Sequence, residues 1–151
     1  METYNYKKFK KLNINTTLQD NVSFNRQKYT FRGLHYQLKP YAQSKLIRVD
    51  QGEILDFILD LRPRSKTFLS MITIKISEKD HKQIYMPKGI AHGYLTLKAN
   101  TKVIYKVDQY YSKKHFGGIN ILDPKLKSKI NKSKFILNIR DKNLPYINEK
   151  H

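Results

Sequence analysis

Cysteine is absent from this chain of 151 residues. That absence excludes a disulfide framework, a thiolate nucleophile and cysteine-ligated zinc, and it fits a reducing compartment. No apolar run approaches the roughly 20 residues of a membrane span. The first residues, Met1-Glu2-Thr3-Tyr4, lack the basic and apolar pattern of a signal peptide. We therefore expect a cytoplasmic protein with no membrane segment, folded as a single domain over residues 1–151.

Acidic residues are also scarce, with 12 against 30 basic ones, and the formal net charge is +18. A field of this sign attracts anions, so nucleic acid and a nucleotide diphosphate are both candidate ligands. The lysines are spread along the whole chain, with a denser patch from Lys125 to Lys134. No basic stripe interleaved with aromatic residues stands out, which makes nucleic acid the less favoured partner. A composition rich in lysine, with no functional meaning, is an equally good explanation of the charge.

The remaining pattern is one of short strands separated by turns, with an arm or short helix over residues 1–15. Strands of this length with turn signals between them predict an all-β sandwich or barrel. The segments expected as strands are 16–21, 29–37, 45–50, 54–61, 67–76, 83–86, 92–97 and 102–108.

The strand at 54–61 has one purely apolar face and one mixed face. The mixed face carries Asp56 and Asp60. Because a buried charge is costly without a partner, Asp56 is predicted to face a polar cavity, whereas Asp60 can lie at the strand end. The apolar face needs cover, and a second subunit is the simpler source of it, so a homodimer is expected.

Two of the five histidines, His35 and His92, lie in strand-like segments beside a glycine. A single histidine in a strand is usually a satisfied core residue, but two of them together with Asp56 favour a polar cavity. Tyr36 and Gln37 follow His35 where the metal-binding cupin barrels have a second histidine, so no metal is expected. Histidine without a metal performs acid–base chemistry near neutral pH.

Two further residues share strand faces with apolar neighbours. Tyr105 lies on the face of Val103 and Val107, and Lys45 lies on the face of Ile47 and Val49. An inward tyrosine can act as an acid, and an inward lysine can stabilise an enolate oxygen. The alternatives are a tyrosine hydroxyl satisfied in the core and a lysine that extends to water.

These residues lie in blocks that resemble one known family. Arg32-Gly33-Leu34-His35-Tyr36-Gln37 is similar to the RGLHxQ signature of the dTDP-4-dehydrorhamnose 3,5-epimerase family. The resemblance covers about residues 1–145 in order and nearly without gaps. Its other blocks are Ala42–Val49, Gly52–Asp56, Asp60–Arg62, Ser65–Phe68, Pro87–Tyr94, Tyr105-Lys106 and Tyr110–Ser112.

The resemblance implies a metal-free cupin-type jelly-roll barrel, usually a dimer, that needs no cofactor. It acts on a nucleotide-linked 4-keto-6-deoxy sugar, in the synthesis of deoxysugars for surface polysaccharides or glycosylated metabolites. By similarity, His35 removes the proton at C3 or C5, Lys45 holds the enolate, and Tyr105 returns a proton from the opposite face. Asp141 orients His35, and Asp56 pairs with His92 near the sugar. The implied substrate contacts are Glu2, Gln19, Asn21, Arg32, His92 and Asp56.

The chain also departs from the family pattern. The family usually has about two dozen more residues before the segment that matches Met1–Tyr4, including an arginine that helps to bind the nucleotide. A family glycine is Ser44 here, an acidic ligand-contact position is Phe116, and Ile130–Ser133 replaces a segment with tryptophan. Strict alternation would also place Arg32 and His35 on opposite faces of their strand, unless a bulge at Gly33 intervenes.

Three other functions remain open from the sequence. A 3,4-ketoisomerase on the same barrel would move the carbonyl instead of inverting a centre. A non-catalytic nucleotide-sugar binder would show affinity without proton exchange. A nucleic-acid-binding barrel would show steeply salt-dependent DNA binding.

Overall fold

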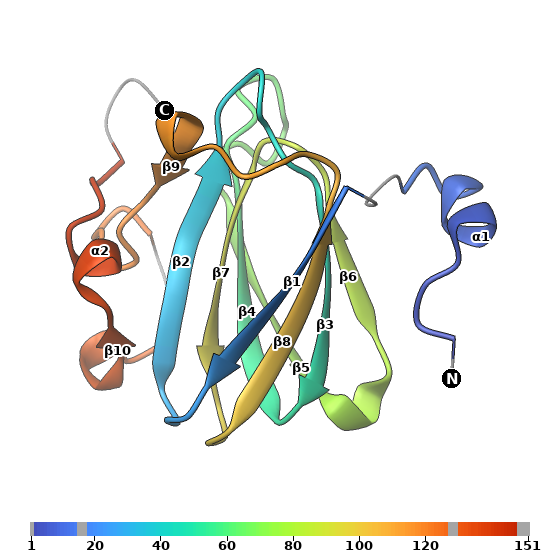
Figure 1. The fold of residues 1–151 in the computed structure, drawn as a ribbon. Helices are drawn as coiled ribbons and strands as arrows, with labels where there is room; N and C mark the ends of the chain where they lie inside the picture. The colour runs from blue at the N-terminus through green and yellow to red at the C-terminus, as the bar shows by residue number, and fades with distance from the viewer. Residues whose placement is uncertain (1, 15–17, 127–129, 148–151) are drawn as a thin grey trace.

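Two β-sheets face each other in the computed structural model, which describes residues 2–14, 18–126 and 130–147 (Figure 1). One sheet has four strands in the order β1-β8-β3-β6, and the other has the order β10-β2-β7-β4-β5, with β9 paired to β2. The strands are β1 Gln19–Asn25, β2 Thr30–Gln37, β3 Lys45–Gln51, β4 Glu53–Asp60, β5 Met71–Ser77, β6 Gln83–Met86, β7 Ile90–Thr96, β8 Thr101–Val107, β9 Phe116–Gly118 and β10 Ile136–Leu137. The helices are α1 Tyr6–Lys10 and α2 Ile139–Lys142, with 3-10 turns at Glu78–Asp80, Lys113–His115 and Lys132–Lys134.

The all-β prediction is confirmed, and each of the eight expected strand segments contains all or part of a strand. The helix expected within 1–15 is α1, which Asn5 caps by accepting a hydrogen bond from the Lys8 N–H. The first expected strand was placed too early, because β1 begins at Gln19, and residues 16 and 17 lie outside the described part. None of the helices in the described part is long and apolar enough to cross a membrane.

The segment expected as a strand from residue 67 is a turn until Ser70, and β5 begins only at Met71. The cause is Asp60, whose carboxylate is 5 % exposed at the end of β4. It accepts hydrogen bonds from the side chains of Arg62, Ser65 and Thr67 at 2.6 to 2.9 Å. Thr67 is thereby held in the loop, where its hydroxyl donates a hydrogen bond to the buried carboxylate.

Two hydrophobic cores lie on opposite faces of the larger sheet. The inner one, between the sheets, contains Ile47, Ile54 and Val103. The outer one contains Phe57 and Leu59 of β4. It is covered by apolar side chains from the C-terminal segment of the same chain, namely Ile119, Ile121, Leu126, Phe135, Leu137 and Ile147. The expectation that a second subunit covers the apolar face of β4 is therefore wrong, because side chains from residues 119–126 and 130–147 do so.

Strand β2 is irregular where the site requires it. Its pairing with β7 shifts register between Arg32 and His35, and Gly33 has φ 129°. A Cβ on Gly33 would lie 2.4 Å from the Cα of Gly93, so only glycine allows the two backbones to approach this closely. The irregularity brings Arg32 and His35 to the same cavity, as a bulge at Gly33 predicts.

Candidate functional site

A cavity of about 330 Å³ opens between the two sheets. Strands β1, β2, β3, β7, β8 and β9, two loops and α2 supply the side chains that line it. The lining residues are Ser23, Arg32, His35, Tyr36, Gln37, Gln43, Lys45, His92, Tyr94, Tyr105, Tyr111, Phe116 and Arg140. Five charged or titratable residues predicted from the sequence, namely Arg32, His35, Lys45, His92 and Tyr105, thus meet in one place.

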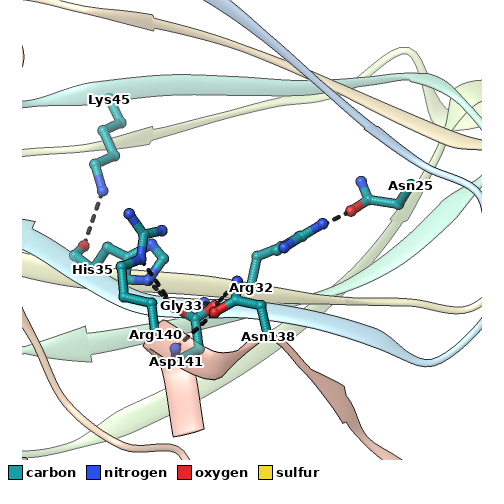
Figure 2. A network of polar contacts seen from close by, with 8 residues as sticks. All are labelled: Asn25, Arg32, Gly33, His35, Lys45, Asn138, Arg140 and Asp141. Atoms are coloured by element: carbon teal, nitrogen blue, oxygen red, sulfur yellow. Dashed lines mark hydrogen bonds and ion pairs between the residues drawn. The ribbon is translucent and has the colours of Figure 1, made fainter. Parts of the chain in front are cut away.

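His35 is hydrogen-bonded to Asp141 across 106 residues of sequence, with 2.7 Å between Nε2 and Oδ1 (Figure 2). The Asp141 side chain is fully buried. Its other oxygen accepts hydrogen bonds from the Gly33 N–H at 3.3 Å and from Asn138 Nδ2 at 3.1 Å. Asn138 also caps α2 by accepting from the Asp141 N–H. The carboxylate therefore has a fixed orientation that holds the imidazole ring.

Burial and charge act on the two partners in opposite directions. Burial lowers the pKa of His35 below its usual value, although the Asp141 carboxylate opposes that change. Burial acts to raise the pKa of Asp141, but the bonds from His35 and Gly33 outweigh it and hold that pKa below its usual value. At neutral pH the pair is therefore a neutral imidazole beside an ionised carboxylate, which is the form that a general base requires.

Lys45 points inward from the start of β3, as predicted. Its ammonium group donates a hydrogen bond of 2.9 Å to the His35 carbonyl oxygen. Burial lowers the pKa of Lys45 to about 8, although the nearby Asp56 carboxylate acts to raise it. Lys45 is thus a cation held inside the cavity, close to the point at which it loses its proton.

The predicted pair of Asp56 and His92 is present, with 2.6 Å between His92 Nε2 and Asp56 Oδ1. Asp56 is fully buried, on the inner face of β4. Its other oxygen, Oδ2, has no hydrogen-bond partner among the described residues. Asp56 was predicted to face a polar cavity, but it is buried behind His92, and only His92 of the two lines the cavity.

Two tyrosines face the cavity from neighbouring positions. Burial raises the pKa of Tyr105, and Tyr94 adds to the effect. Tyr94 donates its hydroxyl hydrogen to Ser23 Oγ at 2.6 Å. The Tyr105 hydroxyl makes no hydrogen bond to another of the described residues. Tyr105 therefore stays protonated at neutral pH with a proton available for donation.

Arg32 reaches into the cavity from β2, and its Nε donates to Asn25 Oδ1 at 3.3 Å (Figure 2). Gln19 and Asn21 lie on the inner side of β1 and bond to each other at 2.7 Å. Gln19 also accepts from the N–H of Tyr111, which is a lining residue. These two amides are thus beside the cavity mouth without lining it.

Glu2 is the predicted site residue that the described chain does not bring to the cavity. It lies before α1, which in Figure 1 stands apart from β2 and β7 on the far side of β6. There Glu2 pairs with Lys8 at 2.8 Å and accepts from Asn5. A contact between Glu2 and a ligand in this cavity would have to come from another subunit.

Arg140 is the charged lining residue that sequence reasoning missed, and the uncharged ones are Ser23, Tyr36, Gln37, Gln43, Tyr94 and Tyr111. Its guanidinium group stands beside His35 in Figure 2, 4.9 Å from the centre of the Phe116 ring. Its position directly before Asp141 could have identified it. On a single helical turn, the neighbour of a site residue is itself a candidate for the site. Among the described residues, no cluster of three or more His, Asp or Glu side chains could hold a metal ion.

Comparison with known proteins identifies the family of this chain. The model of the family described as dTDP-4-dehydrorhamnose 3,5-epimerase matches residues 1–149. The chain belongs to this family. An epimerase of that name from Sinorhizobium fredii is 42 % identical over 107 residues, which are 71 % of this chain and 55 % of the relative. The chain thus matches little more than half the length of that relative.

Solved structures of the family superpose closely. The epimerase from Bacillus anthracis, with TDP and PPi bound, has a TM-score of 0.92 at 43 % identity, covering 97 % of this chain and 84 % of that one. An epimerase from Legionella pneumophila in complex with dTDP-4-keto-L-rhamnose has a TM-score of 0.85 at 33 % identity, covering 96 % of this chain and 78 % of that one. The cupin-type jelly-roll fold is therefore confirmed.

Proposed function

We propose that this chain epimerises a nucleotide-linked 4-keto-6-deoxy sugar, such as dTDP-4-keto-6-deoxyglucose, at C3, at C5 or at both. The single observation that carries the proposal is the His35–Asp141 pair facing a cavity that also holds Lys45 and Tyr105. Membership of the epimerase family supports the same reaction type.

The steps follow from the protonation states. His35 donates its Nε2 hydrogen to Asp141, which leaves Nδ1 as the base that removes a proton from the carbon next to the ketone. The electron pair of the broken C–H bond moves to form a C=C bond, and the carbonyl electrons move onto O4. The Lys45 ammonium stabilises this enolate oxygen. Tyr105 then gives its hydroxyl proton to the opposite face of the carbon, and the centre is inverted.

The substrate's diphosphate needs cations, and Arg32 and Arg140 supply planar guanidinium groups at the cavity. Gln19 and Asn21 offer amides for the nucleoside beside the mouth. His92, held by Asp56, is placed to contact the sugar. A role for Glu2 requires that the N-terminal segment of one subunit reach the cavity of another.

We also propose a homodimer, on grounds other than the face of β4. The outer face of β1 carries Val22 and Phe24, whose side chains are 63 % and 51 % exposed. In register beside Val22 lies Ile104 of β8. An apolar patch on an outward sheet face is typical of a subunit contact.

The deciding experiment is proton exchange in deuterium oxide with dTDP-4-keto-6-deoxyglucose, followed by NMR at C3 and C5. Wild-type protein is expected to remove one or both signals and His35→Ala to remove neither. His81→Asn, at an exposed turn, is the matched control and is expected to behave as wild type. Movement of the ketone to C3 would establish ketoisomerase chemistry instead. Binding without exchange would establish a non-catalytic binder, and either result would overturn the proposal.

A further inference from the structure

Phe116 stands between two functional groups of the cavity. As the first residue of β9 it pairs with Gln37 of β2, so the sheet fixes its backbone. Its ring centre lies 5.2 Å from that of His35 and 4.9 Å from the Arg140 guanidinium carbon. A cation within about 6 Å of a ring centre is attracted by the ring's negative face. The ring is thus in contact with both the base and a cation.

The other neighbours of Arg140 hold its charge weakly. Its Nε lies 3.5 Å from Asp141 Oδ1, a separation at the limit of a hydrogen bond. Both oxygens of Asp141 already accept shorter bonds, from His35, Gly33 and Asn138. More than half of the Arg140 side chain is exposed, so without the ring it would be free to turn to water.

The identity of residue 116 decides the charge of this wall. A carboxylate at this position would pair with Arg140 and neutralise its charge. An aromatic ring attracts the guanidinium without cancelling its charge. Among the described lining residues, Arg32 and Arg140 are always positively charged, Lys45 is positively charged below about pH 8, and none is acidic.

We propose that Phe116 is a positioning residue that holds the Arg140 guanidinium at the cavity wall beside His35, with its charge directed to the diphosphate of a nucleotide ligand. This inference rests on the proposed function for the class of its ligand. It assigns Phe116 a role in binding through Arg140, distinct from the proton transfers.

The ring has a second effect, on the base. Several charged and titratable groups share the cavity with His35 or pair with it. They are Asp141 and Arg140 of α2, Arg32 and Tyr36 of β2, Lys45 of β3, His92 and Tyr94 of β7, Tyr105 of β8, and Tyr111. Loss of the ring admits water and loosens Arg140. Both changes remove influences that lower the His35 pKa, so that pKa should rise.

The test is a double-mutant cycle on dTDP binding, measured by calorimetry, which needs no turnover. Phe116→Met keeps an apolar side chain of similar volume but has no ring. We expect it to weaken binding about three- to tenfold, the size of a partly desolvated cation–π contact. Phe116→Tyr keeps the ring and should bind as wild type. In an Arg140→Gln background, Phe116→Met should change affinity less than about twofold, because the partner of the ring is gone.

Equal losses from Phe116→Met in both backgrounds would overturn the inference, since the ring would then act independently of Arg140. Weak binding by Phe116→Tyr would overturn it as well. Phe116→Leu replaces Phe116→Met if the latter does not fold. As a readout beyond affinity, the acid limb of kcat/KM should move to higher pH in Phe116→Met and stay in place in Phe116→Tyr.

Failure of the proposed function gives a different pattern. If wild-type protein binds dTDP and the cycle shows coupling, but no sugar proton exchanges, the reaction is wrong and the role of Phe116 stands. If the sugar protons exchange normally but the effects of Phe116→Met and Arg140→Gln on dTDP binding simply add, only the role of Phe116 is rejected. Wild-type protein that does not bind dTDP rejects both.

Discussion

The imidazole of His35 takes its chemistry from Asp141, a residue 106 positions away in the sequence. Asp141→Asn keeps the size of the side chain but removes the charge that orients the ring and favours its protonated form. We expect exchange to fall by roughly 10²- to 10⁴-fold, the range seen when an orienting carboxylate is neutralised. Because the carboxylate raises the His35 pKa, its loss should move the acid limb of kcat/KM to lower pH.

The measurement is the rate of solvent exchange at the sugar carbon between about pH 5 and 9, a range that spans the ordinary histidine pKa. Asp50→Asn is the control, because Asp50 pairs with Arg48 on the outside of the sheet at 2.6 Å. It should leave rate and profile unchanged. An Asp141→Asn profile that matches wild type would show that the pair has no part in the chemistry.

Lys45 determines the opposite side of the pH profile. Burial lowers its pKa to about 8, whereas burial raises the pKa of Tyr105. As pH rises, Lys45 therefore loses its proton before Tyr105 does, and the enolate loses its counter-ion. We expect kcat/KM to fall as pH rises through about 8.

Lys45→Arg keeps a positive charge at all these pH values, so the fall near pH 8 should disappear even if the maximum rate is lower. Lys106→Arg, on the outer side of β8 and paired with Asp20, is the control and should retain the fall. If the fall persisted in Lys45→Arg, a group other than Lys45 would be titrating.

The sequence predicted these residues for reasons that differ in kind. Alternation along a strand is local, and it correctly turned Lys45 and Tyr105 inward. The pairing of His35 with Asp141 came only through the family resemblance, since no local pattern links β2 to a single helical turn. Arg140 and Phe116 were missed as a pair because their contact depends on how α2 lies against β9, which is tertiary geometry.

Among the elements, the C-terminal segment was the least predictable and is the one that completes the site. Strands β9 and β10 have three and two residues, too short for an alternating pattern to be recognised. Their positions follow from pairing with β2. The longer strands were predictable because turn residues bound them, although the Asp60 loop shows how a buried carboxylate can delay a strand start.

Asn120 anchors this segment. It is 5 % exposed, and its side chain donates to the Lys142 carbonyl oxygen at 2.8 Å and accepts from the Leu122 N–H at 2.9 Å. Lys142 follows Asp141 directly, so the bond holds the end of α2. Asn120→Ala should cost about 1–3 kcal/mol of unfolding free energy, because two part-buried hydrogen bonds are lost, each worth about 0.5–1.5 kcal/mol.

Hydrogen–deuterium exchange of residues 139–147 should rise in Asn120→Ala, and sugar proton exchange should fall several-fold as Asp141 loses its place. Asn131→Ala is the control, because Asn131 caps an exposed turn by accepting from the Ser133 N–H. It should change neither quantity. Unchanged protection of 139–147 in Asn120→Ala would show that the outer core alone holds the segment.

At the scale of the whole molecule, the two sheets differ in what covers their outer faces. The larger sheet is covered on the outside by residues 119–126 and 130–147. The smaller sheet leaves Val22 and Phe24 largely exposed, while the N-terminal segment reaches it near β6 through a bond from Gln83 to the Thr3 carbonyl oxygen. A second copy is therefore expected on the β1 side of the smaller sheet.

Light scattering of wild-type protein should give the mass of two chains, and Val22→Lys should give one, because burying an unpaired ammonium in an apolar contact is costly. Leu122→Lys, at a partly exposed apolar residue elsewhere, should leave the mass unchanged. The monomeric variant also tests Glu2: if Glu2 contacts ligand across the dimer, Val22→Lys should weaken dTDP binding as Glu2→Gln does, and the two losses should not add. A wild-type monomer would contradict the dimer and remove Glu2 from the site with it.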